Sequence, residues 1–278
     1  MGEKRFNGKA IYNPSGKAGE YSYWACNFYT GCSNDCAYCY CKRGVMSHVW
    51  SNTAKLKKCF KNKKHAIEMF EKELIQNLPE LQKYGLFFTF TSDPFIPETI
   101  NLTRKAISIC IDNFVPVKVL TKRADFLDKL DFPDGKWTAV HWSLSTVMKT
   151  YISFGFTLTG HDELEPGAST NTERIETMKI LHEAGFKTWA SIEPIIDLKA
   201  SRSCIEQTLG FCDLYKIGLM SGGKLPDKEE LRLFVGRVCY LISAHGAKVY
   251  WKDGLKKHLG RDIVSAATVG RDYNIFNE

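Results

Sequence analysis

The chain has 278 residues, of which 44% are hydrophobic and 25% are charged, and its net charge is +7 with a pI near 8.8. This length can bury a large core and suits one α/β domain. Because no apolar run approaches the roughly 20 residues that cross a bilayer, and the first residues lack the apolar segment of a secretory signal, we expect a cytoplasmic protein without membrane contact. In that reducing compartment, ten cysteines favour thiols or metal ligands over disulfides.

The positive charge is concentrated in one segment, residues 55–65. Six lysines fall within ten positions there: Lys55, Lys57, Lys58, Lys61, Lys63 and Lys64. Such a run could follow the phosphates of a nucleic acid, which makes nucleic acid a possible partner. A solvated loop and helix start explains the same residues. Nothing in these patterns indicates an oligomeric state.

Strand-like and helix-like periodicities alternate along the chain. We expect strands within residues 21–28, 85–94, 115–122, 137–145, 186–196, 213–220 and 247–252. Helices are expected within residues 65–78, 101–113, 124–130, 174–185, 201–211 and 228–246. Thr170 and Glu173 form a possible capping box, and Gly185 and Gly246 supply helix stops. Residues 154–170 are expected to form a polar insertion between the fourth strand and its helix.

About six strand and helix pairs imply an α/β fold, with a parallel sheet curved into a full or partial (β/α)6 barrel of the TIM type. We expect one domain, residues 1–278, with an N-terminal extension (1–21), a barrel core (22–220) and a C-terminal helix, strand and tail (221–278). Active sites of such folds lie at the C-terminal ends of the strands. The polar and glycine residues at these positions are Thr91, Ser92, Asp93, Thr121, Lys122, Ser143, Ser145, Glu193 and Gly218. Ordinary turn and cap roles explain any one of them alone.

The segment GCSNDCAYCYC at residues 31–41 contains four cysteines, three of which form the spacing CxxxCxxC. Structural zinc sites usually take two separated pairs of ligands, and zinc here would need Cys41 as a fourth ligand in a very tight loop. Three thiolates, from Cys32, Cys36 and Cys39, can instead hold three irons of a [4Fe–4S] cluster. The fourth iron then stays open to another ligand.

This loop resembles the signature of the radical S-adenosylmethionine (SAM) superfamily, which is CxxxCxxC with an aromatic residue, here Tyr38, before the third cysteine. The resemblance implies a partial barrel of the radical SAM type and chelation of SAM by the open iron. It further implies that an electron from an external flavodoxin- or ferredoxin-type reductant cleaves SAM to a 5′-deoxyadenosyl radical, which abstracts hydrogen from a substrate. The protein would supply orientation and exclusion of water.

Within this superfamily, residues 22–220 are similar to the spore photoproduct lyase-like family. The likeness rests on CSNDCAYCY with its second tyrosine Tyr40, on TSDPF, on LTK, and on LEPGAS…RI…LHEAGF…SIEPII. It implies that Ser92 and Asp93 contact SAM, that Lys122 reaches the SAM carboxylate and that Ser143 contacts the nucleoside. From their positions at strand ends, Thr91 and Ser145 are also expected to contact SAM. Glu193 is then a ribose partner. Tyr38 and Tyr40 are candidate catalytic residues in a radical or hydrogen-bond relay, and packing against the cluster and SAM is the alternative for both.

One residue departs from the family pattern. The lyase has a cysteine that returns a hydrogen atom to the product two residues before its Ser-Asp pair, where this chain has Phe90. The repair reaction is therefore not carried over, and a thiol would have to come from Cys26 or Cys41. We expect a nucleic acid or nucleotide substrate, with a peptide or small molecule as the alternative. From a different class, a non-enzymatic zinc-containing nucleic-acid-binding protein would use all four loop cysteines.

Overall fold

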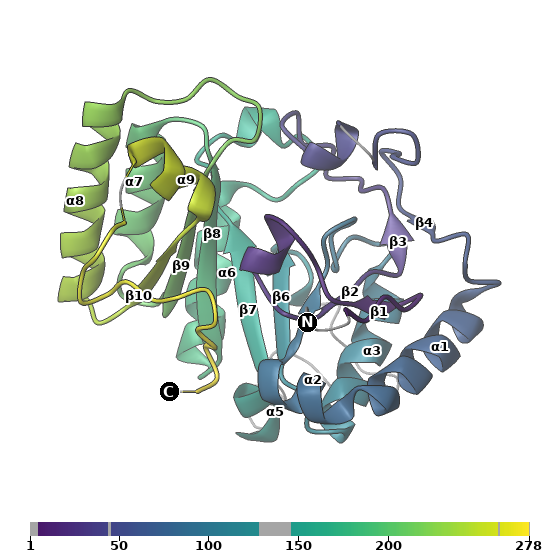
Figure 1. Ribbon diagram of the computed structural model, residues 1–278. Helices are drawn as coiled ribbons and strands as arrows, with labels where there is room; N and C mark the ends of the chain where they lie inside the picture. Colours follow the sequence, from purple (N-terminus) through teal and green to yellow (C-terminus); the bar gives the residue numbers. More distant parts are fainter. Residues whose placement is uncertain (1–4, 44–45, 128–145, 261, 278) are drawn as a thin grey trace.

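The computed structural model describes residues 5–43, 46–127, 146–260 and 262–277 (Figure 1). Its main sheet has eight strands, and β2 to β10 follow one another in chain order with every neighbouring pair parallel. The strands are β1 (Ile11–Tyr12), β2 (Ala25–Cys26), β5 (Leu86–Phe88), β6 (Val117–Thr121), β7 (Ile152–Thr157), β8 (Lys187–Ile195), β9 (Leu214–Leu219) and β10 (Lys248–Trp251). β1 pairs antiparallel with β2 at one edge. The expected α/β class is confirmed, but within the described residues no pairing joins β1 to β10, so the sheet is open.

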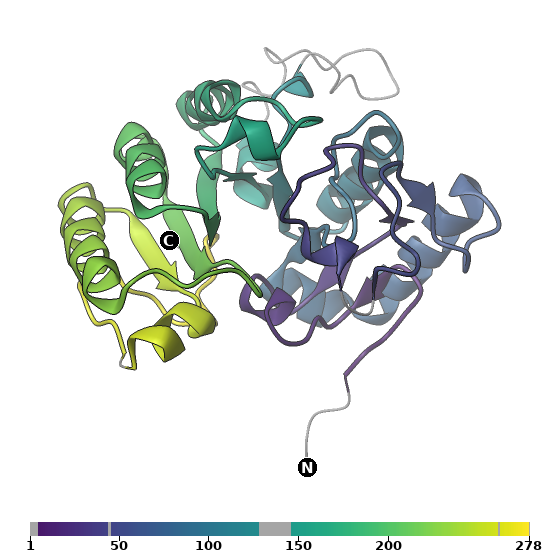
Figure 2. The same ribbon diagram turned by 90° about the horizontal axis from the view of Figure 1, so that it is seen from above.

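Helices connect the parallel strands and lie on the outer side of the curved sheet, as Figure 2 shows. They are α1 (Lys63–Gln76), α2 (Leu78–Tyr84), α3 (Ile100–Asp112), α5 (Thr146–Tyr151), α6 (Asn171–Glu183), α7 (Leu198–Thr208), α8 (Lys228–Ala244) and α9 (Asp253–Leu259). Buried aliphatic and aromatic side chains fill the space between these helices and the sheet. None of the described helices is long and apolar enough to span a bilayer.

The helix signals in the sequence are confirmed where the structure describes them. Thr170 caps α6, and the reciprocal bond from its backbone to Glu173 completes the capping box. Gly185 and Gly246 both have positive φ, at 93° and 73°, as helix-ending glycines require. These local rules need only neighbouring residues, which explains their success.

The expected fourth strand is corrected. β7 occupies the place beside β6, so residues 154–157 belong to the sheet and not to a polar insertion. All six residues of β7 are buried, and Gly155 is needed because a Cβ there would lie 2.1 Å from Trp189 of β8. Ile152, Phe154 and Phe156 alternate with small residues, so the strand signal was present. The strand expected within residues 137–145 lies outside the described residues.

The N-terminal segment packs closely against the main sheet. Residues 17–21, which include the 3₁₀ helix η1 (Ala18–Glu20), lie against β9 and β10. Lys216 of β9 donates hydrogen bonds from Nζ to the carbonyls of Glu20 and Tyr21, at 2.9 and 3.0 Å. A second, two-stranded sheet pairs β3 (Tyr29–Thr30) antiparallel with β4 (Lys55–Leu56), and the cysteine loop lies in the segment that connects them.

Candidate functional site

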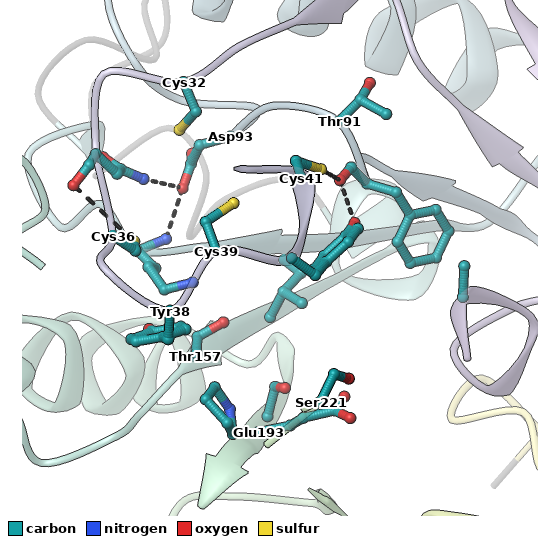
Figure 3. Close-up of a pocket in the computed structure, with 18 of the residues that line it drawn as sticks. Cys32, Cys36, Tyr38, Cys39, Cys41, Thr91, Asp93, Thr157, Glu193 and Ser221 are labelled. Carbon is teal, nitrogen blue, oxygen red and sulfur yellow. Dashed lines mark hydrogen bonds between the residues drawn. The ribbon is translucent and has the colours of Figure 1, made fainter. Parts of the chain in front are cut away.

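A pocket of about 280 Å³ opens at the C-terminal ends of the parallel strands (Figure 3). Its two sides differ in origin. One side, which we call the cysteine wall, comprises Cys32, Asn34, Cys36, Tyr38, Cys39, Tyr40, Cys41, Thr91, Ser92, Asp93 and Lys122. The other side, the polar wall, comprises Tyr21, Ser191, Glu193, Ser221 and Lys252. Figure 3 shows Glu193 and Ser221 across the pocket from Cys32 and Cys39.

Backbone contacts on both sides fix the cysteine loop. Gly31 has φ of 91°, and a Cβ there would lie 2.5 Å from the carbonyl oxygen of Thr53, so this turn requires glycine. Farther along the loop, the backbone of Ala37 donates to Leu164 at 2.8 Å, and Gly167 donates to Asn34 at 3.1 Å. The loop is therefore held between residues 51–53, which precede β4, and the segment that joins β7 to α6.

The four loop thiols have different environments. Burial raises the pKa of Cys32 and of Cys36, which are 9% and 7% exposed. A hydrogen bond from Cys41 lowers the pKa of Cys39 below its usual value. Cys41 is 1% exposed, and its Sγ also lies 3.7 Å from the Phe90 carbonyl. Cys41 thus acts as a hydrogen-bonding neighbour of Cys39.

In the part of the chain that the structure describes, no three His, Cys, Asp or Glu side chains lie close enough to hold one metal ion. A structural zinc site needs four ligands at about 2.0–2.3 Å from a single ion. In a cluster each cysteine binds a different iron, so the sulfurs are farther apart. Cys32, Cys36 and Cys39, on one loop around an open pocket, are a donor set that suits a cluster.

Asp93 connects the cysteine loop to two strand ends. Its side chain is buried, and Oδ2 accepts hydrogen bonds from Asn34 Nδ2 at 2.9 Å and from the Lys122 backbone at 2.7 Å. Oδ1 accepts from the Phe95 backbone at 2.9 Å and from Thr121 Oγ1 at 2.8 Å. Both oxygens are therefore engaged by the protein, and the carboxylate positions the loop.

Ser92 differs from its neighbours. Its Oγ is buried in the pocket without a hydrogen-bond partner among the described residues, so it is available to a ligand. Thr91, by contrast, donates its hydroxyl to the Tyr29 carbonyl at 2.6 Å. Ser143 and Ser145, which the sequence placed in the site, lie outside the described residues.

A chain of polar groups runs behind the cysteine wall. Burial opposes the charge on Lys122, but the nearby Tyr38, Cys36 and Glu165 hold its pKa well above the usual value. The ammonium lies 5.4 Å from the centre of the Tyr38 ring, and the Tyr38 hydroxyl donates to Glu165. Glu165 in turn pairs with Arg174 of α6, and both side chains have no exposed surface. A positive ammonium group is thus held at the pocket.

Tyr40 and Phe90 meet at the mouth of the pocket. The Tyr40 hydroxyl donates to the Phe90 carbonyl, although 55% of Tyr40 is exposed. The Phe90 ring stacks on Phe87 with a centroid distance of 4.3 Å. A packed phenyl ring therefore lines the pocket at the position that departs from the family pattern.

The polar wall was largely missed by sequence reasoning, which named only Glu193 of it as a SAM contact. Glu193 Oε2 accepts hydrogen bonds from Lys252 Nζ and from the Tyr21 hydroxyl, both at 2.6 Å. The Tyr21 hydroxyl also lies 2.7 Å from Ser191 Oγ. Thr157, at the end of β7, lines the pocket as well and was missed because the strand was misplaced. No local signal marks Tyr21 or Lys252, since they meet Glu193 from opposite ends of the chain.

Comparison with known proteins adds one relative. The chain is 28% identical over 192 residues to an uncharacterised protein of Methanocaldococcus jannaschii. The aligned region covers 68% of this chain and 67% of that protein. No family model matches the chain. No solved structure matches it either.

Proposed function

We propose that this protein is a radical SAM enzyme whose open sheet is a partial (β/α)6 barrel. In this proposal Cys32, Cys36 and Cys39 hold a [4Fe–4S] cluster. When bound, the cluster and SAM supply a 5′-deoxyadenosyl radical that abstracts hydrogen from a substrate, after reduction by a flavodoxin- or ferredoxin-type partner. The observation that carries the proposal is that the three CxxxCxxC cysteines line a pocket at the C-terminal ends of the parallel strands.

The cysteine wall supports the cluster assignment through its thiols. The hydrogen bond from Cys41 lowers the pKa of Cys39, which favours its thiolate. Thiolate is the form that binds iron. Asp93 holds the loop through Asn34, so the ligands are positioned before the cluster binds. Cys41 remains a neighbour in this assignment.

The remaining pocket groups match the chemistry of SAM. The ammonium of Lys122 is suited to a carboxylate, and the unpartnered Ser92 hydroxyl can donate or accept at the same end of the pocket. Glu193, on the polar wall, is suited to hydroxyl donors of a ribose. Leu120 and Phe90 give the pocket apolar surface, which limits water around bound ligands.

The test is anaerobic reconstitution of the full chain with iron and sulfide. We expect about four irons per chain, and formation of 5′-deoxyadenosine when the reduced protein receives SAM. Cys36→Ala should abolish both, whereas Cys41→Ala, a matched change of a buried cysteine on the same loop, should keep the iron. A colourless protein that binds zinc and does not cleave SAM would support a zinc-containing nucleic-acid-binding protein instead. If Cys41→Ala loses iron as fully as Cys36→Ala does, the three-ligand assignment is wrong.

For the substrate we propose a nucleic acid or nucleotide. Lys55, Lys58, Lys61 and Lys63 are exposed along β4 and the start of α1, and none has an ion-pair partner among the described residues. β4 pairs with β3, which leads directly into the cysteine loop. Transfer of deuterium into 5′-deoxyadenosine from labelled oligonucleotides tests this class. Transfer from a labelled peptide alone would favour a peptide substrate.

A further inference from the structure

The two oxygens of Glu193 have different surroundings. Oε2 accepts two hydrogen bonds at 2.6 Å, from Tyr21 and from Lys252, and so is fully engaged. No described residue donates a hydrogen bond to Oε1, which lies next to Gly218 of β9 on a residue that lines the pocket. The carboxylate is therefore held at one oxygen, and the other is free to accept.

The two donors come from opposite ends of the chain. Tyr21 follows η1 in the N-terminal segment, and Lys252 follows β10. Lys252 is only 2% exposed, lies 4.2 Å from the centre of the Tyr21 ring, and donates to the Lys17 carbonyl at 3.3 Å. Lys17 in turn donates from Nζ to Ser221 Oγ at 2.8 Å, beyond the end of β9. The N-terminal segment thus spans the pocket edge between β8 and β10.

Packing and charge make this arrangement rigid. Lys252 Nζ lies 2.6 Å from Glu193 and 3.5 Å from Glu20, so one buried ammonium contacts the buried carboxylate of Glu20 and the partly buried carboxylate of Glu193. Glu20 also accepts from the Asp253 backbone at 2.7 Å, which ties the segment to the start of α9. Burial and the nearby Glu193 raise the pKa of Tyr21, so its hydroxyl stays a donor at neutral pH.

We infer that Tyr21 and Lys252 are positioning residues, which fix Glu193 so that Oε1 accepts a hydrogen bond from a ribose hydroxyl of bound SAM. The N-terminal segment, residues 17–21, then completes the SAM site. This inference rests on the proposed function. A hydroxyl donor fits because Oε1 is a carboxylate oxygen at the pocket that no described residue supplies with a donor, and a hydrogen bond to a carboxylate is stronger than one to a neutral acceptor.

The experiment measures SAM binding to the reconstituted, unreduced full chain by equilibrium dialysis. Tyr21→Phe keeps the ring and removes only the hydroxyl, so we expect the Kd for SAM to rise about tenfold while the iron content stays unchanged. The KM for SAM should rise with little change in kcat, because binding of substrate and transition state is weakened equally. Lys257→Met is the control for the second variant, Lys252→Met: it removes an exposed lysine of α9 whose side chain has no hydrogen-bond or ion-pair partner among the described residues, and it should bind SAM like the wild type.

A double-mutant cycle separates positioning from general destabilisation. If Tyr21 acts through Glu193, the double variant Tyr21→Phe, Glu193→Gln should bind SAM no more weakly than Glu193→Gln alone. Wild-type affinity in Tyr21→Phe, or full additivity in the double variant, would overturn the inference while SAM cleavage by the wild type stands. If the wild type itself neither binds nor cleaves SAM, the proposed function fails and this inference with it. Lys252→Met is a secondary variant, because it leaves the carboxylates of Glu20 and Glu193 without the ammonium group that they share.

Discussion

The two walls of the pocket are built in different ways. The cysteine wall comes mainly from one short loop, residues 32–41, and is fixed from behind by the buried carboxylate of Asp93. The polar wall combines residues 17–21, β8, the end of β9 and the residue after β10. The first wall offers thiols and the free Ser92 hydroxyl to the pocket, whereas most groups of the second are bonded to one another.

Two acidic residues illustrate the difference. Asp93 accepts four hydrogen bonds from the protein, two at each oxygen. Glu193 accepts its two at a single oxygen and leaves the other open. Asp93 follows β5 and Glu193 lies near the end of β8, so position alone does not separate a residue that holds the site together from one that can contact a ligand. Counting the hydrogen bonds at each carboxylate oxygen separates the two roles.

The largest expected effect concerns the support of the cysteine wall. Arg174→Met should lower the free energy of unfolding by about 3–5 kcal/mol, because it leaves Glu165 charged and buried without its partner. Urea denaturation measures the change. Arg202→Met, which breaks a half-exposed pair on α7, is the control and should change stability by less than about 1 kcal/mol. Equal effects would show that the buried pair does not stabilise this wall.

A second test replaces Asp93 with asparagine. The amide keeps the shape but places a donor against the buried donors that the carboxylate satisfies, so we expect a loss of about 3 kcal/mol in unfolding free energy. Iron uptake should fall as well, because Asn34 no longer fixes the cysteine loop. The unfolding free energy and the iron uptake are measured on the same preparation. Unchanged iron uptake in a folded variant would contradict the positioning role.

The polar wall is tested by Gly218→Ala. A Cβ there would lie 2.8 Å from Glu193 Oε1 and 2.9 Å from Lys252 Cδ, so it should displace Glu193 and cost about 1–3 kcal/mol. SAM affinity should fall, with the iron content unchanged. Gly236→Ala in α8 is the control: no atom lies within 4 Å of its Cβ, and a gain of about 0.5–1 kcal/mol is expected. Normal SAM affinity in Gly218→Ala would indicate that the polar wall tolerates displacement of Glu193.

The smallest effect is expected from a polar cluster that lies outside both walls. Burial opposes the charge on His161, but hydrogen bonds with Glu163 and Asp197 raise its pKa above 6.5. Protonated His161 therefore stabilises the fold, and this contribution is fully present below pH 6.5, the usual pKa of histidine. The contribution is lost as the pH rises through the folded-state pKa. His161→Gln should therefore lower stability at low pH by less than about 1 kcal/mol and converge on the wild type as pH rises. His48→Gln, at an exposed residue, should give no such trend.

Much of the fold could be predicted because its signals are local. Capping residues and glycine stops placed α6 and α8, and apolar runs placed β5, β6, β8, β9 and β10. β7 was missed because its alternating pattern includes glycine and threonine, which also favour loops. The curvature of the sheet was expected, but whether its edges meet depends on long-range pairing that periodicity does not encode.

The sequence by itself determined the cysteine wall, because its four thiols lie close together on one loop. It also placed Ser92, Asp93, Lys122 and Glu193 at strand ends, where the pocket lies. Only the tertiary structure decided that Asp93 is engaged by the protein and Ser92 is free. It alone brought Tyr21 and Lys252 to Glu193, because residues 231 positions apart become neighbours only after the sheet has folded and its polar groups need partners.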